Sequence, residues 1–370
     1  MSFDFLSMIQ LIADSDPAVR PARFHTNYNP VKMGNMADIA YGGCAIAVAV
    51  NAAIATVEAE SQRRDSSASA KGKSTAAKSK AVYALSGNYL GPARADRPFI
   101  ADVESLRDTK TFTTILVRLK QRLDSGEERS CLVTIVDFVA RSDLPEAQRN
   151  ILTYNAAPPK VAHHSDLPLA SEWQEERVRN NLVPRKTLDM SKVFFGRFMD
   201  IVNSKFPDDS ILGPNLYGLL RDFETKQEHL SIPEKNSTDW FQSTVKLNER
   251  KDGDYTATNA LLPISTYAAN ISLASFFLDG ALAFLGLSFS HRWLADAGAC
   301  SSLDFSLRFH VDDFDLAQWH LREVKTHLST HERTYNEGRM WDEQGRLVAT
   351  MTQVGVLRKL PERSQKQEKL

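Results

Sequence analysis

The chain has 370 residues, of which 42% are hydrophobic and 25% are charged. These values are ordinary for a folded globular protein, and they exclude wholesale disorder, collagen-like repeats and a membrane bundle. The 45 basic and 46 acidic residues nearly cancel, so the composition lacks the basic excess of a protein that grips nucleic acid phosphates. At about 150 residues per domain, the length predicts two domains.

The three cysteines, Cys44, Cys131 and Cys300, lie far apart in the sequence and form no CxxC pair. We therefore expect reduced thiols and a reducing compartment. No basic and apolar signal peptide opens the chain. The C-terminal residues Glu368-Lys369-Leu370 differ at one position from the Ser-Lys-Leu peroxisomal address. These features predict a cytoplasmic protein, with peroxisomal import as the alternative.

The N-terminal domain is expected to span residues 1–140. An alanine-rich apolar run, Ala40–Val57, predicts a helix that is buried nearly all round. Residues 61–80 are rich in Ser, Ala and Lys, and we interpret them as a flexible surface insertion. The alternating segments that follow predict four strands, at Ala81–Leu90, Phe99–Leu106, Thr111–Leu123 and Cys131–Ala140.

Residues 141–186 contain five prolines and no hydrophobic periodicity, which is typical of a linker. The C-terminal domain, residues 187–362, repeats the earlier plan, and residues 363–370 form a polar tail. A helix is expected over Ile264–Leu287. Strands are expected at Leu303–His310, Trp319–Lys325, Thr334–Asp342 and Arg346–Lys359. A buried helix followed by antiparallel strands, twice along the chain, predicts an α+β fold in which each sheet wraps its helix.

One charged residue interrupts the second apolar run: Asp279 is the only charged side chain in residues 256–290. The run is long enough for a transmembrane helix. Pro263 and Asn270 favour a core helix instead, so we expect no membrane span. A buried carboxylate must find partners or raise its pKa. Two interpretations stay open: a helix-end residue bonded to amides beside Gly280, or a general base or nucleophile in a pocket.

The common catalytic and cofactor motifs are absent from the sequence. There is no P-loop and no G-x-G-x-x-G, and the nearest G-x-S-x-G, Gly286–Ser290, ends in serine. His327 and His331 have the spacing of a helical zinc pair, but their segment alternates like a strand, which would separate the imidazoles. We expect no metal and no cofactor, and we expect Cys44 and Cys300 to be buried small side chains.

Several segments resemble the type II acyl-CoA thioesterases, a family with a double hotdog fold. The similarity is carried by Tyr41-Gly42-Gly43, Ser86–Gln121, Ser301–Leu321 and Gly338–Lys359. The resemblance implies two long central helices, each wrapped by an antiparallel β-sheet, with the sheets joined side by side. It also implies a small-molecule acyl thioester as substrate, carried on CoA or on a carrier protein, and a homo-oligomer.

The resemblance places the family's catalytic residues on Asp279, Ser302 and Gln353. Asp279 would accept a proton from the attacking water, while Ser302 and Gln353 would orient that water by hydrogen bonds. The resemblance also places substrate contacts on a set of residues in the first hotdog: Gly42, Gly43, Cys44, Ser86 and Gly87.

The sequence departs from the family in the first hotdog. Cys44 stands where the family commonly has Gln, Ser86 where it has His, and Thr109 where it has Gly. These changes lie where an acyl chain or pantetheine arm would be, so they predict a specialised acyl group. The predicted function is thioester hydrolysis in lipid metabolism or biosynthesis. The alternatives are a hotdog enzyme for dehydration, cyclisation or rearrangement, and a non-catalytic acyl-binding hotdog protein.

Overall fold

The structure is a computed structural model that describes residues 3–34, 37–70, 79–247 and 261–361. Its α-helices are α1 (Phe5–Ile9), α2 (Gly42–Ala70), α3 (Glu146–Arg149), α4 (Ala170–Arg179), α5 (Arg185–Met199), α6 (Thr266–Leu278) and α7 (Leu285–Phe289). Its strands are β1 (Leu11–Ala13), β2 (Ala22–Thr26), β3 (Lys80–Tyr89), β4 (Ile100–Asp108), β5 (Phe112–Arg122), β6 (Glu128–Ala140), β7 (Val202–Lys205), β8 (Asn236–Ser243), β9 (Ala297–Phe309), β10 (His320–Thr330), β11 (Arg333–Asp342) and β12 (Leu347–Lys359).

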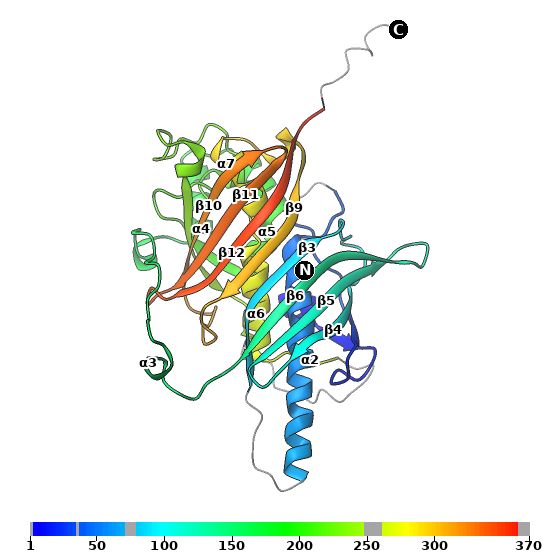
Figure 1. Ribbon diagram of the computed structural model, residues 1–370. Helices are drawn as coiled ribbons and strands as arrows, with labels where there is room; N and C mark the ends of the chain where they lie inside the picture. The colour runs from blue at the N-terminus through cyan, green and yellow to red at the C-terminus, as the bar shows by residue number, and fades with distance from the viewer. Residues whose placement is uncertain (1–2, 35–36, 71–78, 248–260, 362–370) are drawn as a thin grey trace.

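These strands form one sheet in the order β1-β2-β4-β5-β6-β3-β9-β12-β11-β10-β8-β7. The two halves of the sheet join through β3 and β9, which pair antiparallel from Ala84 opposite Arg308 to Asn88 opposite Asp304. Figure 1 shows α2 and α6 behind the sheet, close to this junction. The double hotdog α+β fold expected from the resemblance is confirmed.

The central helices α2 and α6 run antiparallel, so each helix begins where the other has its later residues. At one end the Tyr41 hydroxyl donates to the Phe276 carbonyl at 2.8 Å, and at the other the Ser265 hydroxyl donates to Glu58 Oε1 at 2.7 Å. The stretches Gly42–Ser67, in α2, and Thr266–Phe289, which runs from α6 through α7, are long and apolar enough to span a membrane, but 83% of each apolar window is buried within the fold. In this structure they are core helices.

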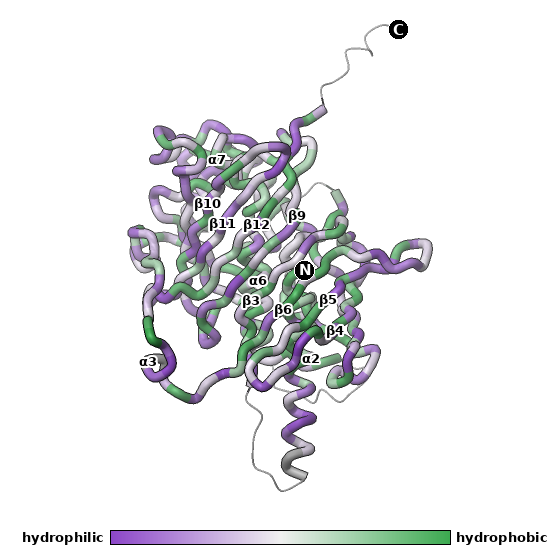
Figure 2. The backbone as a smooth tube through the Cα atoms, viewed as in Figure 1, coloured by the Kyte–Doolittle hydropathy of each residue, from purple (hydrophilic) through white to green (hydrophobic). Residues whose placement is uncertain are grey.

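The insertion expected at residues 61–80 begins as helix. Helix α2 continues through Ala70, and residues 71–78 lie outside the described part of the chain. Ion pairs support these extra turns: Arg64 lies 3.8 Å from Glu60 on the same helix face and 2.6 Å from Asp108 on β4. Figure 2 shows that this end of α2 is hydrophilic where it extends beyond the sheet.

The helix expected over residues 264–287 is shorter than predicted. Helix α6 ends at Leu278, and Ala281 adopts a left-handed conformation with φ 73° before a second, short helix, α7, begins. Hydropathy does not reveal this break, because the residues on both sides are equally apolar. The break places Asp279 at the end of α6 rather than inside a helix.

Residues 141–186 are more structured than an extended linker. They contain α3 and α4, and α5 follows from Arg185. The side chains of Trp240 and Trp341 donate to the carbonyls of Ala162 and Ala156, at 2.9 and 2.8 Å. These bonds attach the segment to the strands of the C-terminal half.

Candidate active site

Asp279 is the C-cap of α6 and is 5% exposed. Its backbone is fixed by Arg322, which donates to the carbonyls of Phe277 and Gly280, both at 3.3 Å. Arg322 is in turn held by Asp239, with 2.9 Å from Nε to Oδ1. This buried ion pair fixes the turn that carries Asp279. It was not predicted, because the pair joins β10 to β8, a strand that was not expected.

Two side chains donate hydrogen bonds to the same oxygen of Asp279. Gln353 Nε2 lies 2.7 Å from Oδ1, and the Tyr89 hydroxyl lies 3.2 Å from it. The other oxygen, Oδ2, faces the start of α2, where a Cβ atom on Gly42 would lie only 3.0 Å away. Gly42 therefore provides the space that lets α2 begin directly against the carboxylate.

Burial raises the pKa of Asp279 to about 6, because desolvation disfavours the charged form. The hydrogen bonds from Gln353, Tyr89 and the amide of Gly43 oppose this rise. Asp279 also lies at the C-terminal end of α6, where the helix dipole disfavours a negative charge. A carboxyl group with a pKa near neutrality can both accept and release a proton under physiological conditions.

Gln353 is completely buried on β12, and its Oε1 accepts no hydrogen bond from the described residues. Ser302 on β9 pairs with Gly355 of β12. A β-bulge at Leu303 shifts the alternation, so that Ser302 and Phe305 both lie on the inner face of the sheet. The structure thus brings Gln353 into contact with Asp279. Ser302 makes no direct bond to Asp279, but both line one cavity, whose wall does not include Gln353.

This cavity has a volume of about 810 Å³, within the range of small-molecule sites. Gly42, Asp279 and Ser302 lie in its wall. A set of aromatic side chains faces them: Phe194, Phe195, Phe198, Tyr217, Phe284 and Trp293. The first three come from α5, which the sequence did not predict, so this aromatic wall was missed.

The other residues expected to contact substrate lie outside the wall of this cavity. Gly43 packs against the Phe276 carbonyl, and Cys44 is buried with its Sγ 3.8 Å from the Val31 carbonyl. Burial raises the pKa of Cys44 to about 12, which keeps it a thiol. Ser86 is exposed, and Gly87 lies close to the neighbouring strand β6. Of the five, Gly42 lines the cavity, and contact with substrate stays a prediction for all five.

The two histidines considered as a zinc pair are separated, as the alternation of their segment predicted. His327 lies on β10 and is 3.1 Å from Glu337, whereas His331 lies in the turn after β10 and contacts Thr330. The histidines thus have different partners and share no site.

Comparisons with known proteins identify the family of the chain. Residues 29–139 match the family model of the acyl-CoA thioesterase N-terminal domain, and residues 207–357 match that of the C-terminal domain. The chain is 21% identical over 278 residues to acyl-CoA thioesterase 2 of Haemophilus influenzae, covering 75% of this chain and 79% of that protein.

Two solved structures have the same fold. The tesB protein of Mycobacterium avium subs paratuberculosis has a TM-score of 0.58 at 16% identity, over 96% of this chain and 98% of the other. A hot dog fold protein from Alicyclobacillus acidocaldarius has a TM-score of 0.56 at 15% identity, over 97% and 99%. With both family domains matched in order over most of its length, the chain belongs to the type II acyl-CoA thioesterase family and is a thioester hydrolase.

Proposed function

We propose that the protein hydrolyses acyl-CoA thioesters, with Asp279 as the general base. The observation that carries this proposal is a buried carboxylate with a pKa near 6 that faces a cavity of about 810 Å³. The relative from Haemophilus influenzae is named as an acyl-CoA thioesterase, which supports CoA as the carrier.

In the proposed reaction, water attacks the thioester carbonyl carbon while its proton passes to Asp279. Gln353 holds one oxygen of Asp279 through Nε2, and its free Oε1 can accept a hydrogen bond from the water. The hydroxyl of Ser302 provides a second orienting group in the cavity wall. The C–S bond then breaks, and the CoA thiolate takes up a proton as the carboxylic acid is released.

The beginning of α2 is well placed to stabilise the oxyanion that forms on the carbonyl oxygen. Backbone N–H groups at a helix N-terminus lack partners within the helix, and the helix dipole favours negative charge there. The Gly43 amide already bonds to Asp279, so the contribution proposed for this end of α2 is the field of its helix dipole where Gly42 lines the cavity.

We propose that the acyl group lies against the aromatic wall. Phe195 and Tyr217 have ring centroids 4.2 Å apart, and Phe194 and Trp293 have centroids 5.1 Å apart. Residues 185–199 lie outside both ranges that match the family models. Part of the proposed acyl pocket therefore comes from a segment that neither family model covers, and its rings favour a flat or bulky acyl group that can stack on them.

The test is release of free CoA thiol from a panel of acyl-CoAs with aliphatic and aryl acyl groups. We expect Asp279→Asn to lower kcat by about 10²–10⁴, the usual contribution of a general base. The matched control is Asp208→Asn, because Asp208 has an 82% exposed side chain. In the wild type, kcat/KM should rise with pH up to about 6 and then level off, since only the ionised Asp279 can accept the proton.

Equal thiol release by Asp279→Asn and the wild type would contradict the assigned role. Mass spectrometry of the products separates the remaining alternatives. An acyl-CoA that loses water or changes its isomeric form while it keeps CoA would indicate dehydration, cyclisation or rearrangement. Saturable binding without any product would indicate an acyl-binding protein.

A further inference from the structure

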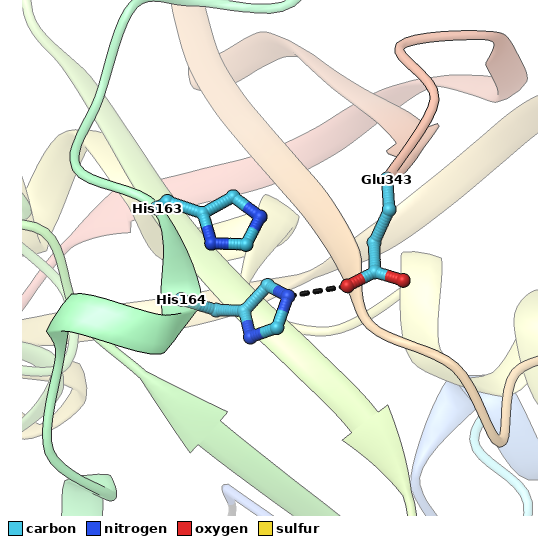
Figure 3. A group of neighbouring side chains, drawn as sticks. All are labelled: His163, His164 and Glu343. Carbon is cyan, nitrogen blue, oxygen red and sulfur yellow. Dashed lines mark hydrogen bonds and ion pairs between the residues drawn. The ribbon is translucent and has the colours of Figure 1, made fainter.

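Two adjacent histidines and a glutamate form a cluster that lies apart from the active-site cavity. His163 and His164 belong to the segment between the two hotdog halves, and Glu343 lies in the turn between β11 and β12. One ligand atom from each of the three residues lies within 4.8 Å of the others. In Figure 3 both imidazoles turn a ring nitrogen toward the carboxylate, and His164 Nε2 is bonded to Glu343 Oε1.

We propose that His163, His164 and Glu343 form a zinc-binding site. Two imidazoles and one carboxylate are a ligand set that zinc uses, with a fourth position open to water. With Zn–N and Zn–O bonds of about 2.1 Å, tetrahedral ligand atoms lie about 3.4 Å apart. Small rotations of these partly exposed side chains are enough to close the remaining distance.

The surroundings hold both histidines in place before any ion binds. The ring of His164 stacks on Trp319, with centroids 5.0 Å apart and planes 18° apart. The His164 carbonyl accepts a hydrogen bond from Lys205 Nζ at 2.7 Å. His163 Nδ1 lies 2.9 Å from Ser165 Oγ. His163 Nδ1 also accepts the Ser165 backbone N–H at 3.3 Å, so its contacts with Ser165 fix the orientation of the ring.

The site would fasten the segment between the halves to the β11–β12 turn. The same segment already touches this turn at one more point, where Asn155 Nδ2 donates to the Gly345 carbonyl at 3.3 Å. Without a metal, the partly exposed His164–Glu343 pair contributes little to stability. A zinc ion bound by all three residues would hold the segment firmly against the β11–β12 turn.

The proposal is tested on the full-length protein after chelator treatment, by calorimetric titration with zinc chloride and by limited proteolysis of the segment. We expect one zinc ion per chain, and slower cleavage within residues 141–162 when zinc is present. His164→Ala and Glu343→Gln should each weaken zinc binding at least tenfold and abolish the protection. The matched control is His327→Ala, because His327 also pairs with a glutamate, Glu337, but has no second histidine beside it.

Failure to bind zinc, or binding that is equally tight in His164→Ala, would overturn the proposal. So would zinc binding that leaves the rate of cleavage unchanged, since the ion would then not connect the two elements. None of the three ligands lines the active-site cavity, so thiol release from acyl-CoA should be the same in all these variants. The zinc site and the proposed hydrolysis can thus fail independently.

Discussion

Asp279→Asn should make the protein more stable while it removes the proposed general base. Burial raises the pKa of Asp279 from 3.8 to about 6. At 1.36 kcal/mol per pH unit, keeping this carboxyl ionised in the folded protein costs about 3 kcal/mol. Asparagine is neutral and can still accept the hydrogen bond from Gln353, which lies 2.7 Å from Oδ1. The variant should therefore lack this unfavourable contribution to its folding free energy.

The dependence on pH follows from the direction of the shift. Between pH 3.8 and about 6 the folded protein keeps the proton on Asp279, whereas the unfolded chain has lost it. The contribution of Asp279 to the stability of the wild type therefore falls as pH rises through this window. Relative to the wild type, Asp279→Asn should gain nothing near pH 4 and about 3 kcal/mol above pH 7.

The assay is urea unfolding of the two proteins side by side from pH 4 to pH 8. Asp208→Asn is the control, because a substitution at an exposed surface pair should change stability by less than about 1 kcal/mol at any pH. The reasoning is refuted if Asp279→Asn is no more stable than the wild type at pH 8. It is also refuted if the gain in stability is the same at pH 4 as at pH 8.

Two further substitutions examine the walls of the site. Gly42→Ala puts a Cβ atom 2.8 Å from the Tyr89 hydroxyl and 3.0 Å from Asp279 Oδ2. It should lower kcat at least tenfold, whereas Gly196→Ala, where nothing lies within 4 Å, should leave kcat unchanged. Equal rates in both would show that Gly42 does not position the carboxylate. Phe195→Ala removes a ring from the aromatic wall, so we expect KM for aryl-CoA to rise at least fivefold and KM for acetyl-CoA to change little. An equal rise for both substrates would place the acyl group elsewhere.

The sequence predicted the parts of the fold whose pattern is local. Strands β3 to β6 and β9 to β12 alternate apolar and polar residues between clear turns, and the structure has them within a few residues of the expected bounds. Strand β8 was not predicted, because its sequence is mostly polar. The strand is nevertheless buried, because its backbone is hydrogen-bonded to β10 and the charge of Asp239 is paired with Arg322. The partners that satisfy these buried polar groups come from distant segments of the chain, which a local sequence pattern does not show.

The candidate site could likewise be predicted only in part from the sequence. Asp279 could be singled out because a lone charge in an apolar run needs a physical reason. Gln353 and Ser302 came from the resemblance alone, since nothing in their own strands marks them. The orientation of Ser302 depends on a bulge at Leu303 that appears only when β9 is paired with β12. The contact with Tyr89 similarly required both halves to be in place.

The antiparallel arrangement of the central helices gives the molecule an approximate twofold symmetry that its chemistry does not share. At the other end of the helix pair a second carboxylate, Glu58 of α2, accepts a hydrogen bond from Ser265 at the start of α6, while Asp279 faces the start of α2. Helix α2 does not break there but continues to Ala70, so no turn presents this second carboxylate in the same way. The two carboxylates therefore differ in their settings: Asp279 lies at a helix end beside the cavity, whereas Glu58 lies within a continuous helix.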